Sequence, residues 1–240
     1  MKKLLMFLLF LALVSSITYG VITVYDGNRS IRDSDAQIEM KPKLEYQDPD
    51  PDESSLPLMD FSGLQEENSD IIAWLTIPGT IIDYPVTQTD NNKYYLNHTA
   101  EKKYNVIGAL FLDHRNNKDF SDFYSIIYGH HMKNGKMFGQ LSKFKDKAFF
   151  DATETGTLYT PEKTYRFEIF AVAVTKSTGG YYNYIFPALS DREEHLAMIK
   201  ATAKFYRDIG VTAEDRLLAL STCSYEYKDA RTLVIGRLVG

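Results

Sequence analysis

A single cysteine, Cys223, is the residue of this chain best suited to nucleophilic chemistry. It ends the apolar run 216–223, and the polar segment 224–230 separates it from a second apolar run over residues 231–239. Both runs have the length of core strands, and a short connection usually places consecutive strands side by side. We therefore predict that Cys223 ends one strand and that Arg231 opens the neighbouring strand, beside the thiol.

A thiol nucleophile needs a cationic neighbour or a base that lowers its pKa, together with a proton donor for the leaving group. Of the five histidines, His130 follows the apolar run 125–128 and Gly129, so it emerges where a core strand meets a turn. Reactive side chains are commonly carried at such positions over a rigid scaffold. The residues alone favour His130 only modestly over His131 and His114. The other two histidines, expected at solvated positions, are His98 and His195.

Cys223 and Arg231 also have ordinary structural interpretations. A free cysteine often packs in a protein core as a small hydrophobic residue, and composition alone favours that role. An arginine at a strand end can lay its stem on apolar surface while its charge stays in water. The residue pattern leaves both interpretations of each residue open.

The composition predicts one globular domain with small additions. The chain has 240 residues, of which 44% are hydrophobic and 25% charged, ordinary proportions for a folded domain. Its 27 basic and 32 acidic residues give a formal net charge of -5, so it lacks the basic surface that neutralises phosphates. We therefore expect no nucleic-acid partner. The 17 tyrosines and 14 phenylalanines favour strands over a helical bundle.

The N-terminus predicts a membrane anchor. After Lys2 and Lys3 the chain carries no charge over residues 4–25, which is long enough for a helix that crosses a bilayer. No Ala-x-Ala cleavage site follows, so we favour an uncleaved signal anchor over residues 1–25 and keep a cleaved signal peptide as the alternative. The two lysines hold the N-terminus in the cytoplasm by the positive-inside rule. We therefore predict a single-pass protein of the cell membrane whose catalytic domain is extracytoplasmic.

Residues 26–59 are predicted to form an extracytoplasmic spacer, because they are rich in Asp, Glu, Pro and Ser and offer little apolar surface to bury. A packed domain follows over residues 60–240, with a short helix expected at residues 60–68. Apolar runs of strand length separated by turn residues, such as 106–112 and 125–128, predict that this domain is mainly β.

One long helix is predicted inside the domain. It begins at Ser190, because Glu193 lies three residues further on, at the spacing of a capping box. Gly210 is expected to end it, since glycine commonly follows the last turn of a helix.

Two motifs resemble the active-site motifs of sortases, a family of cysteine transpeptidases of Gram-positive bacteria. The run Leu220-Ser221-Thr222-Cys223, followed by Arg231 at the start of the next apolar run, resembles the sortase signature. The run Tyr128-Gly129-His130 resembles the sortase histidine motif. The signature usually begins with threonine, where this chain has Ala219. We expect that change to matter little, since alternate residues of a strand face away from the site.

Further segments are similar to class B sortases in particular, so the resemblance extends from residue 60 to the end of the chain. These segments are the hairpin 74–86, Asn92 with residues 94–96, residues 108–116, residues 130–138 and the helix over 190–208. The resemblance implies a mainly β fold with added helices. The architecture it implies is a closed eight-stranded sortase-type β-barrel, with an N-terminal helix and a long helix before the cysteine strand.

The resemblance also implies a reaction. Cys223 would attack the threonine carbonyl of a Pro-x-Thr-type sorting signal, with His130 as proton donor and Arg231 as oxyanion stabiliser. The resulting thioacyl enzyme would transfer the protein to an amine of cell-wall peptidoglycan or of its lipid-linked precursor. The implied partners are surface proteins with a C-terminal sorting signal, the peptidoglycan amine, and the membrane through the N-terminal anchor.

A substrate groove is implied as well, although ordinary packing is the alternative for each of its residues. The implied groove residues are Asn92, Leu96, Tyr181, Tyr182, Ile185 and Ser221. No cofactor is expected. No metal site is expected either, because a lone cysteine with scattered histidines lacks the spacing of metal ligands.

Three other functions stay open. A cysteine peptidase would form the same thioester and pass it to water. A pilin-polymerising sortase would join protein subunits instead of anchoring single proteins. A non-catalytic surface-binding module would keep Cys223 packed and unreactive.

Overall fold

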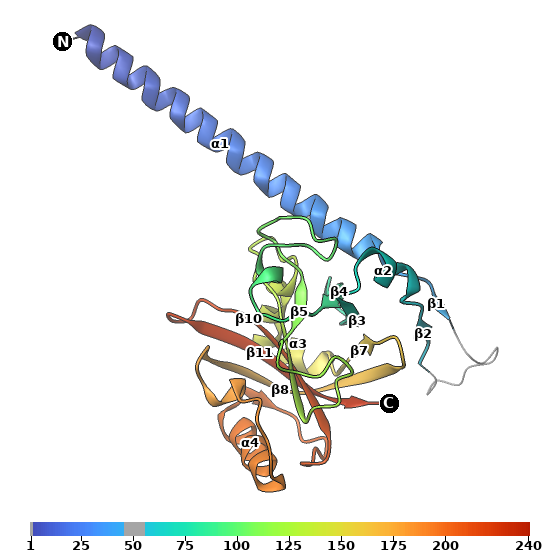
Figure 1. The fold of residues 1–240 in the computed structure, drawn as a ribbon. Helices are drawn as coiled ribbons and strands as arrows, with labels where there is room; N and C mark the ends of the chain where they lie inside the picture. Colours follow the sequence, from blue (N-terminus) through green and yellow to red (C-terminus); the bar gives the residue numbers. More distant parts are fainter. Residues whose placement is uncertain (1, 46–55) are drawn as a thin grey trace.

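The computed structural model describes residues 2–45 and 56–240, and a closed β-barrel forms the centre of the molecule (Figure 1). Its strands are β3 (Ile71–Thr76), β4 (Asp83–Thr87), β5 (Leu110–Leu112), β6 (Tyr124–Tyr128), β7 (Thr155–Tyr159), β8 (Thr164–Lys176), β10 (Arg216–Cys223) and β11 (Ala230–Val239). Neighbours follow in the order β11-β10-β6-β5-β4-β3-β7-β8, and β8 pairs again with β11. The predicted closed eight-stranded barrel is therefore confirmed.

Short helices decorate the barrel. The predicted helix near residues 60–68 is confirmed as α2 (Ser62–Glu67). The other short helical segments are η1 (Tyr94–Leu96), η2 (Phe138–Lys145), α3 (Lys147–Ala152) and η3 (Gly180–Tyr182). The strand predicted over residues 106–112 is shorter than expected. Gly108 has a φ of 63° and its N–H donates to the Asn105 carbonyl at 3.0 Å, so the chain turns there before β5 begins.

The long helix before the cysteine strand is α4 (Leu189–Thr202), which begins within one residue of the predicted start, whereas its predicted end at Gly210 is wrong. It follows Ala188, whose N–H donates to the Asp191 carboxylate at 2.9 Å, so Asp191 takes the place predicted for Glu193. It ends at Thr202 because the following residues pair with β8 as the short strand β9 (Phe205–Tyr206). The backbone hydrogen bonds of that pairing replace the last helical turns that the sequence pattern predicted.

The middle parts of strands β10 and β11 are buried on both faces, which explains the continuous apolar runs 217–220 and 233–235. Leu218 and Val234 belong to the cluster inside the barrel, to which all eight strands contribute. Ala219 and Ile235 belong to a second cluster outside the barrel, which α4 covers through Ile199. The pairing of β10 with β11 is therefore held by two cores at once.

The N-terminal helix α1 (Lys2–Glu39) projects from one end of the domain, and α4 lies at the other end (Figure 1). Residues 26–39, which belong to the predicted spacer, continue this helix. Ser34 and Gln37 are fully buried against the domain, and the Ser34 hydroxyl lies 2.9 Å from the Tyr84 hydroxyl. Polar contacts of this kind anchor the helix although the segment offers little apolar surface.

The rest of the predicted spacer is described only in part. Short strands β1 (Leu44–Glu45) and β2 (Leu58–Met59) pair with each other outside the barrel. The acidic, proline-rich run 48–53, on which the spacer prediction mainly rested, lies outside the described residues.

Candidate active site

The pairing of β10 with β11 places Cys223 beside Arg231. The two residues are Cα partners in the antiparallel ladder. Residues directly opposite each other in such a ladder have Cβ atoms about 4.5–5.5 Å apart. The predicted proximity of this cysteine and this arginine is therefore a consequence of strand register.

The pairing of β10 with β6 brings His130 to the same level. Ser221 is the partner of Tyr128 in this parallel ladder. The alignment continues beyond β6, because the Gly129 N–H donates to the Ser221 carbonyl at 3.1 Å and the Thr222 hydroxyl donates to the Gly129 carbonyl at 2.7 Å. Gly129 is therefore aligned with Thr222. The next residues along the two segments, His130 and Cys223, lie at the same level.

Gly129 allows this close alignment. A Cβ atom at this position would lie 2.5 Å from Leu110 Cδ2 and 2.7 Å from Phe138 Cδ2, distances that no side chain tolerates. The chain at the end of β6 therefore passes tightly between two core side chains. A larger residue here would push the histidine segment away from β10.

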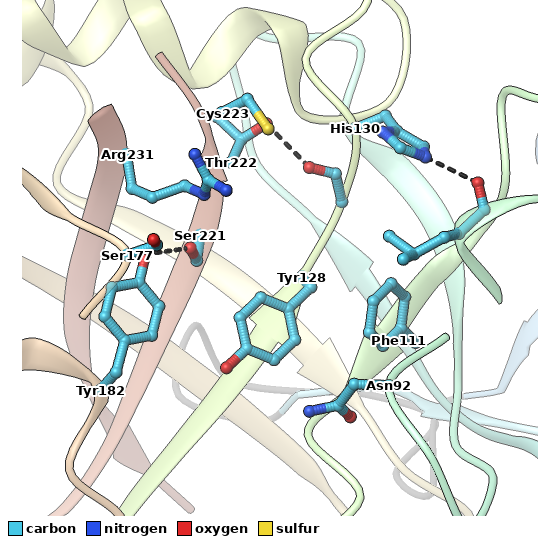
Figure 2. A pocket seen from close by; sticks show the side chains of 12 residues that line it. Asn92, Phe111, Tyr128, His130, Ser177, Tyr182, Ser221, Thr222, Cys223 and Arg231 are labelled. Carbon is cyan, nitrogen blue, oxygen red and sulfur yellow. Dashed lines mark hydrogen bonds between the residues drawn. The ribbon is translucent and has the colours of Figure 1, made fainter. Parts of the chain in front are cut away.

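The three residues surround a pocket of about 240 Å³ (Figure 2). In this view Cys223 lies between Arg231 on one side and His130 on the other. The complete lining is Asn92, Leu96, Phe111, Tyr128, Gly129, His130, Ser177, Tyr182, Ser221, Thr222, Cys223 and Arg231. The thiol is partly exposed, so it is not sealed in the core as the packing interpretation would require.

His130 makes its hydrogen bond with η1. Its Nε2 atom lies 2.7 Å from the Leu96 carbonyl oxygen (Figure 2). In the described part of the chain no hydrogen bond joins His130 to the thiol. Hydrogen bonds between catalytic groups are often long in enzymes without substrate and tighten when substrate binds. The ring is half-exposed and lines the pocket.

Arg231 is also half-exposed, and its guanidinium lies over the pocket. Its Nη1 atom donates to the carbonyl of Ala230 at 2.9 Å. A guanidinium has five N–H donors, so one bond to the backbone fixes its orientation and leaves donors for a ligand in the pocket.

Four of the six predicted groove residues line this pocket: Asn92, Leu96, Tyr182 and Ser221. The Tyr182 and Ser221 hydroxyls lie 2.7 Å apart, which ties η3 to β10. Burial raises the pKa of Tyr182 to about 12, so this hydroxyl stays protonated and can donate.

The other two predicted groove residues lie elsewhere. Tyr181 is buried, and its hydroxyl lies 2.7 Å from the Thr202 hydroxyl at the end of α4. Ile185 is 57% exposed and borders a separate hollow beside α4. Consecutive residues of a 3-10 turn point in directions about 120° apart, so Tyr181 and Tyr182 cannot both face the pocket.

An ion pair between Asp113 and Arg115 contacts Tyr128, which lines the pocket. Burial would raise the pKa of the Asp113 carboxyl, but hydrogen bonds from Arg115 and Tyr128 outweigh it and lower that pKa to about 2. Arg115 donates to Asp113 at 2.7 and 2.9 Å, and its guanidinium stacks 3.7 Å from the ring centre of Tyr184. Asp113 therefore connects the end of β6 with the segment that follows Tyr182.

Sequence reasoning missed several pocket residues. They are Phe111, Tyr128, Gly129, Ser177 and Thr222. Tyr128 and Thr222 belong to the two sortase-like motifs, and their positions in the strands could have identified them as pocket residues. Phe111 lies within the similar segment 108–116, but nothing singled it out there, and Ser177 belongs to a segment with no motif.

The other histidines are placed outside the pocket. His131 packs edge-on against Tyr225 at 5.1 Å, and the Nδ1 atom of His114 lies 3.5 Å from the Asp113 carboxylate. His98 stacks on Tyr94 at 4.0 Å. The prediction that His195 is solvated is wrong, because it is 5% exposed, and burial lowers its pKa to about 4.

No group of three His, Cys, Asp or Glu side chains within residues 2–45 and 56–240 could hold a metal ion.

A family model described as a sortase domain matches residues 75–239 of this chain. The chain belongs to the sortase family. A curated relative, Sortase B of Listeria monocytogenes, is 39% identical over 178 residues, which are 73% of this chain and 72% of the relative.

Solved structures agree with this assignment to class B. The Staphylococcus aureus sortase B–substrate complex has a TM-score of 0.71 and 28% identity, and the match covers 75% of this chain and 84% of that one. A Streptococcus pyogenes class B sortase involved in pilus biogenesis has a TM-score of 0.68 and 39% identity, with 75% and 97% covered. The protein is therefore a class B sortase, a cysteine transpeptidase that acts in the anchoring or processing of surface proteins.

Proposed function

We propose that this sortase cleaves a Pro-x-Thr-type sorting signal after its threonine and transfers the protein to an amine of cell-wall peptidoglycan or its precursor. Cys223 acts as nucleophile, His130 as proton carrier and Arg231 as oxyanion stabiliser. The observation that carries the proposal is the shared level of these three residues on β6, β10 and β11 around one pocket.

In the first step the Cys223 sulfur, as thiolate, attacks the threonine carbonyl carbon and forms a tetrahedral oxyanion. Arg231 donates to that oxygen, and this donation is strongest when the negative charge is fully developed. The bond between threonine and the next residue then breaks. His130 gives its proton to the departing amine, which leaves a thioester on Cys223.

In the second step an acceptor amine attacks the thioester carbonyl. His130, now neutral, takes the proton that the attacking nitrogen releases. The tetrahedral intermediate collapses, the bond to sulfur breaks and Cys223 leaves as thiolate. The surface protein then carries a new amide bond to the acceptor.

We further propose that α1 anchors the enzyme in the cell membrane with the catalytic domain outside. The helix has a mean hydropathy of 2.3 over its most apolar 18-residue window, and that window is not buried in the protein. Its continuation to Glu39, docked on the domain through Ser34 and Gln37, supports an anchor that is retained in the mature protein. The mass of the enzyme purified from membranes tests this, because a cleaved signal peptide would remove the N-terminal residues.

Incubation of the full-length enzyme in detergent with a sorting peptide, with and without an amine acceptor, tests the reaction. We expect a thioacyl adduct of Cys223 without acceptor and an amine-coupled product with it. Release of the free acid alone in both reactions would instead support the cysteine peptidase. A native enzyme whose Cys223 forms no adduct and resists thiol reagents would support the non-catalytic module.

Pilin polymerisation is the second candidate, favoured by the 39% identity to the Streptococcus pyogenes enzyme involved in pilus biogenesis. The two activities differ in the acceptor, which is a cell-wall peptide in one case and an amine of another protein subunit in the other. Offering both acceptors in one reaction distinguishes them by product mass.

A further inference from the structure

The loop over residues 97–108, here called the α1-facing loop, is fastened to α1 just beyond the apolar part of that helix. Arg29 donates from Nη2 to the Tyr104 carbonyl oxygen at 3.1 Å. Ser30 donates from its hydroxyl to the Asn105 side-chain oxygen at 3.1 Å. The loop therefore has a defined position along the helix axis.

Gln37 fastens the same loop two turns further along the helix. It is fully buried, and its side-chain nitrogen donates to the Gly108 carbonyl at 3.2 Å. Its side-chain oxygen accepts from the Ala100 N–H at 3.1 Å. Because both ends of the loop are held, helix and loop behave as one rigid unit.

The α1-facing loop exposes two large side chains with apolar surface, Tyr104 at 60% and Val106 at 59%. Their exposure is not a sign of an unformed loop. The Tyr104 ring packs edge-on against His98 at 5.7 Å, and the backbone on both sides is hydrogen-bonded. Lys102 and Lys103 lie beside them with exposed side chains, which pair with Asp70 at 3.1 Å and with Glu101 at 2.9 Å.

Helix geometry gives the depth of these side chains relative to a bilayer that α1 crosses. The uncharged segment 4–25 is about 33 Å long as an α-helix, close to the thickness of about 30 Å of a bilayer's hydrocarbon core. Arg29 lies one turn beyond Tyr25, about 6 Å further along the axis. A helix that spans the core with this segment therefore carries Tyr104 to the depth of the lipid headgroups.

We infer that the α1-facing loop is a second membrane contact, in which Tyr104 and Val106 enter the headgroup layer of the bilayer that α1 crosses. Tyrosine suits this layer because its ring is apolar and its hydroxyl is wetted. Lys102 and Lys103 lie beside the lipid phosphates. The inference rests on the proposed membrane anchor.

The contact has a consequence for the active site. Leu96 directly precedes the loop, lines the catalytic pocket and accepts the hydrogen bond from His130. With both α1 and the loop in the bilayer, the domain cannot swing about the helix. The mouth of the pocket is then held at a fixed height above the membrane, where membrane-bound substrates reach it.

Spin labelling of the full-length protein in liposomes of mixed zwitterionic and anionic lipids tests the inference. Cys223→Ala removes the only native thiol, and single cysteines are then introduced as Val21→Cys, Tyr104→Cys or Lys200→Cys. Val21 lies in the apolar part of α1, and Lys200 lies on α4 at the opposite end of the domain (Figure 1). Collision of each label with lipid-soluble oxygen and with a water-soluble nickel chelate reports its depth.

We expect the label at position 21 in the hydrocarbon core, the label at 104 in the headgroup layer and the label at 200 in water. A label at 104 that is as accessible to the chelate as the label at 200, with the label at 21 in the core, would overturn the membrane contact and leave the anchor standing. A label at 21 that is in water would overturn both proposals.

Discussion

Replacement of Arg231 by lysine tests the oxyanion role most directly. The substitution keeps the positive charge and most of the side-chain length. It removes the planar fork, whose Nη1 atom is oriented by the Ala230 carbonyl at 2.9 Å. A lysine ammonium is a compact point charge on a flexible stem, so it loses that orientation. If charge alone stabilised the transition state, Arg231→Lys would be nearly harmless.

The expected loss is the value of one oriented oxyanion donor. Arg231 is the Cα partner of Cys223, so its donors lie within reach of an oxygen on the carbon that the sulfur attacks. Removal of such a donor typically lowers turnover roughly 100- to 1000-fold, about 3–4 kcal/mol of transition-state stabilisation. Substrate binding in the ground state should change much less, so kcat should fall while KM stays close to its original value.

The assay is single-turnover acylation by a sorting peptide, followed by mass spectrometry of the thioacyl adduct. Arg166→Lys is a matched control, since Arg166 is an exposed β8 arginine paired with Glu168 at 3.0 Å and lies away from the pocket. It should acylate at the wild-type rate. An Arg231→Lys enzyme that acylates within a few-fold of wild type would refute the reasoning.

Three further predictions concern His130, Asp113 and His195. His130→Gln should abolish amine transfer, whereas His114→Gln, outside the pocket, should keep it; equal losses in the transfer assay would contradict the assignment. The pKa of Asp113 falls from 3.8 to about 2 on folding, so about 2 kcal/mol of stability is present above pH 4 and lost as the pH falls towards 2. Asp113→Asn should remove that loss in denaturant unfolding measured across this range. The pKa of His195 falls from 6.5 to about 4 on folding, so about 3 kcal/mol is lost as the pH falls from 6.5 to 4, and His195→Phe should flatten this slope.

The barrel strands, and the adjacency of Cys223 and Arg231 at their ends, could be predicted because short stretches of the sequence indicate them. Strands β10 and β11 contain continuous apolar runs over residues 217–220 and 233–235, since both faces are buried there. The short polar segment between them makes the strands neighbours, and this alone places Arg231 beside Cys223. The family motifs added His130, which the residues by themselves favoured only modestly.

Other features depended on contacts between distant segments, which no local pattern contains. His195 lies on a helix with charged neighbours and looks solvated in sequence, but Phe123, Tyr124 and Phe186 surround it in the structure. The segment after residue 25 looks like a spacer, but the buried side chain of Gln37 joins it to the α1-facing loop. Phe123 and Tyr124 in the first case, and the α1-facing loop in the second, lie about seventy residues away in the chain.

The same distinction explains why the predicted adjacency of Cys223 and Arg231 is observed, whereas two of the predicted groove residues lie outside the pocket. In a strand, a one-residue slip turns every side chain to the opposite face, so two cores that pack against β10 and β11 allow one register only. The packing of the barrel interior therefore fixes the positions of Cys223 and Arg231. Tyr181 and Tyr182 lie on η3, where no periodic pattern fixes the facing direction, and a single-residue difference decides which of them enters the pocket. Groove specificity in this enzyme can thus change through loop substitutions that leave the reactive residues in place.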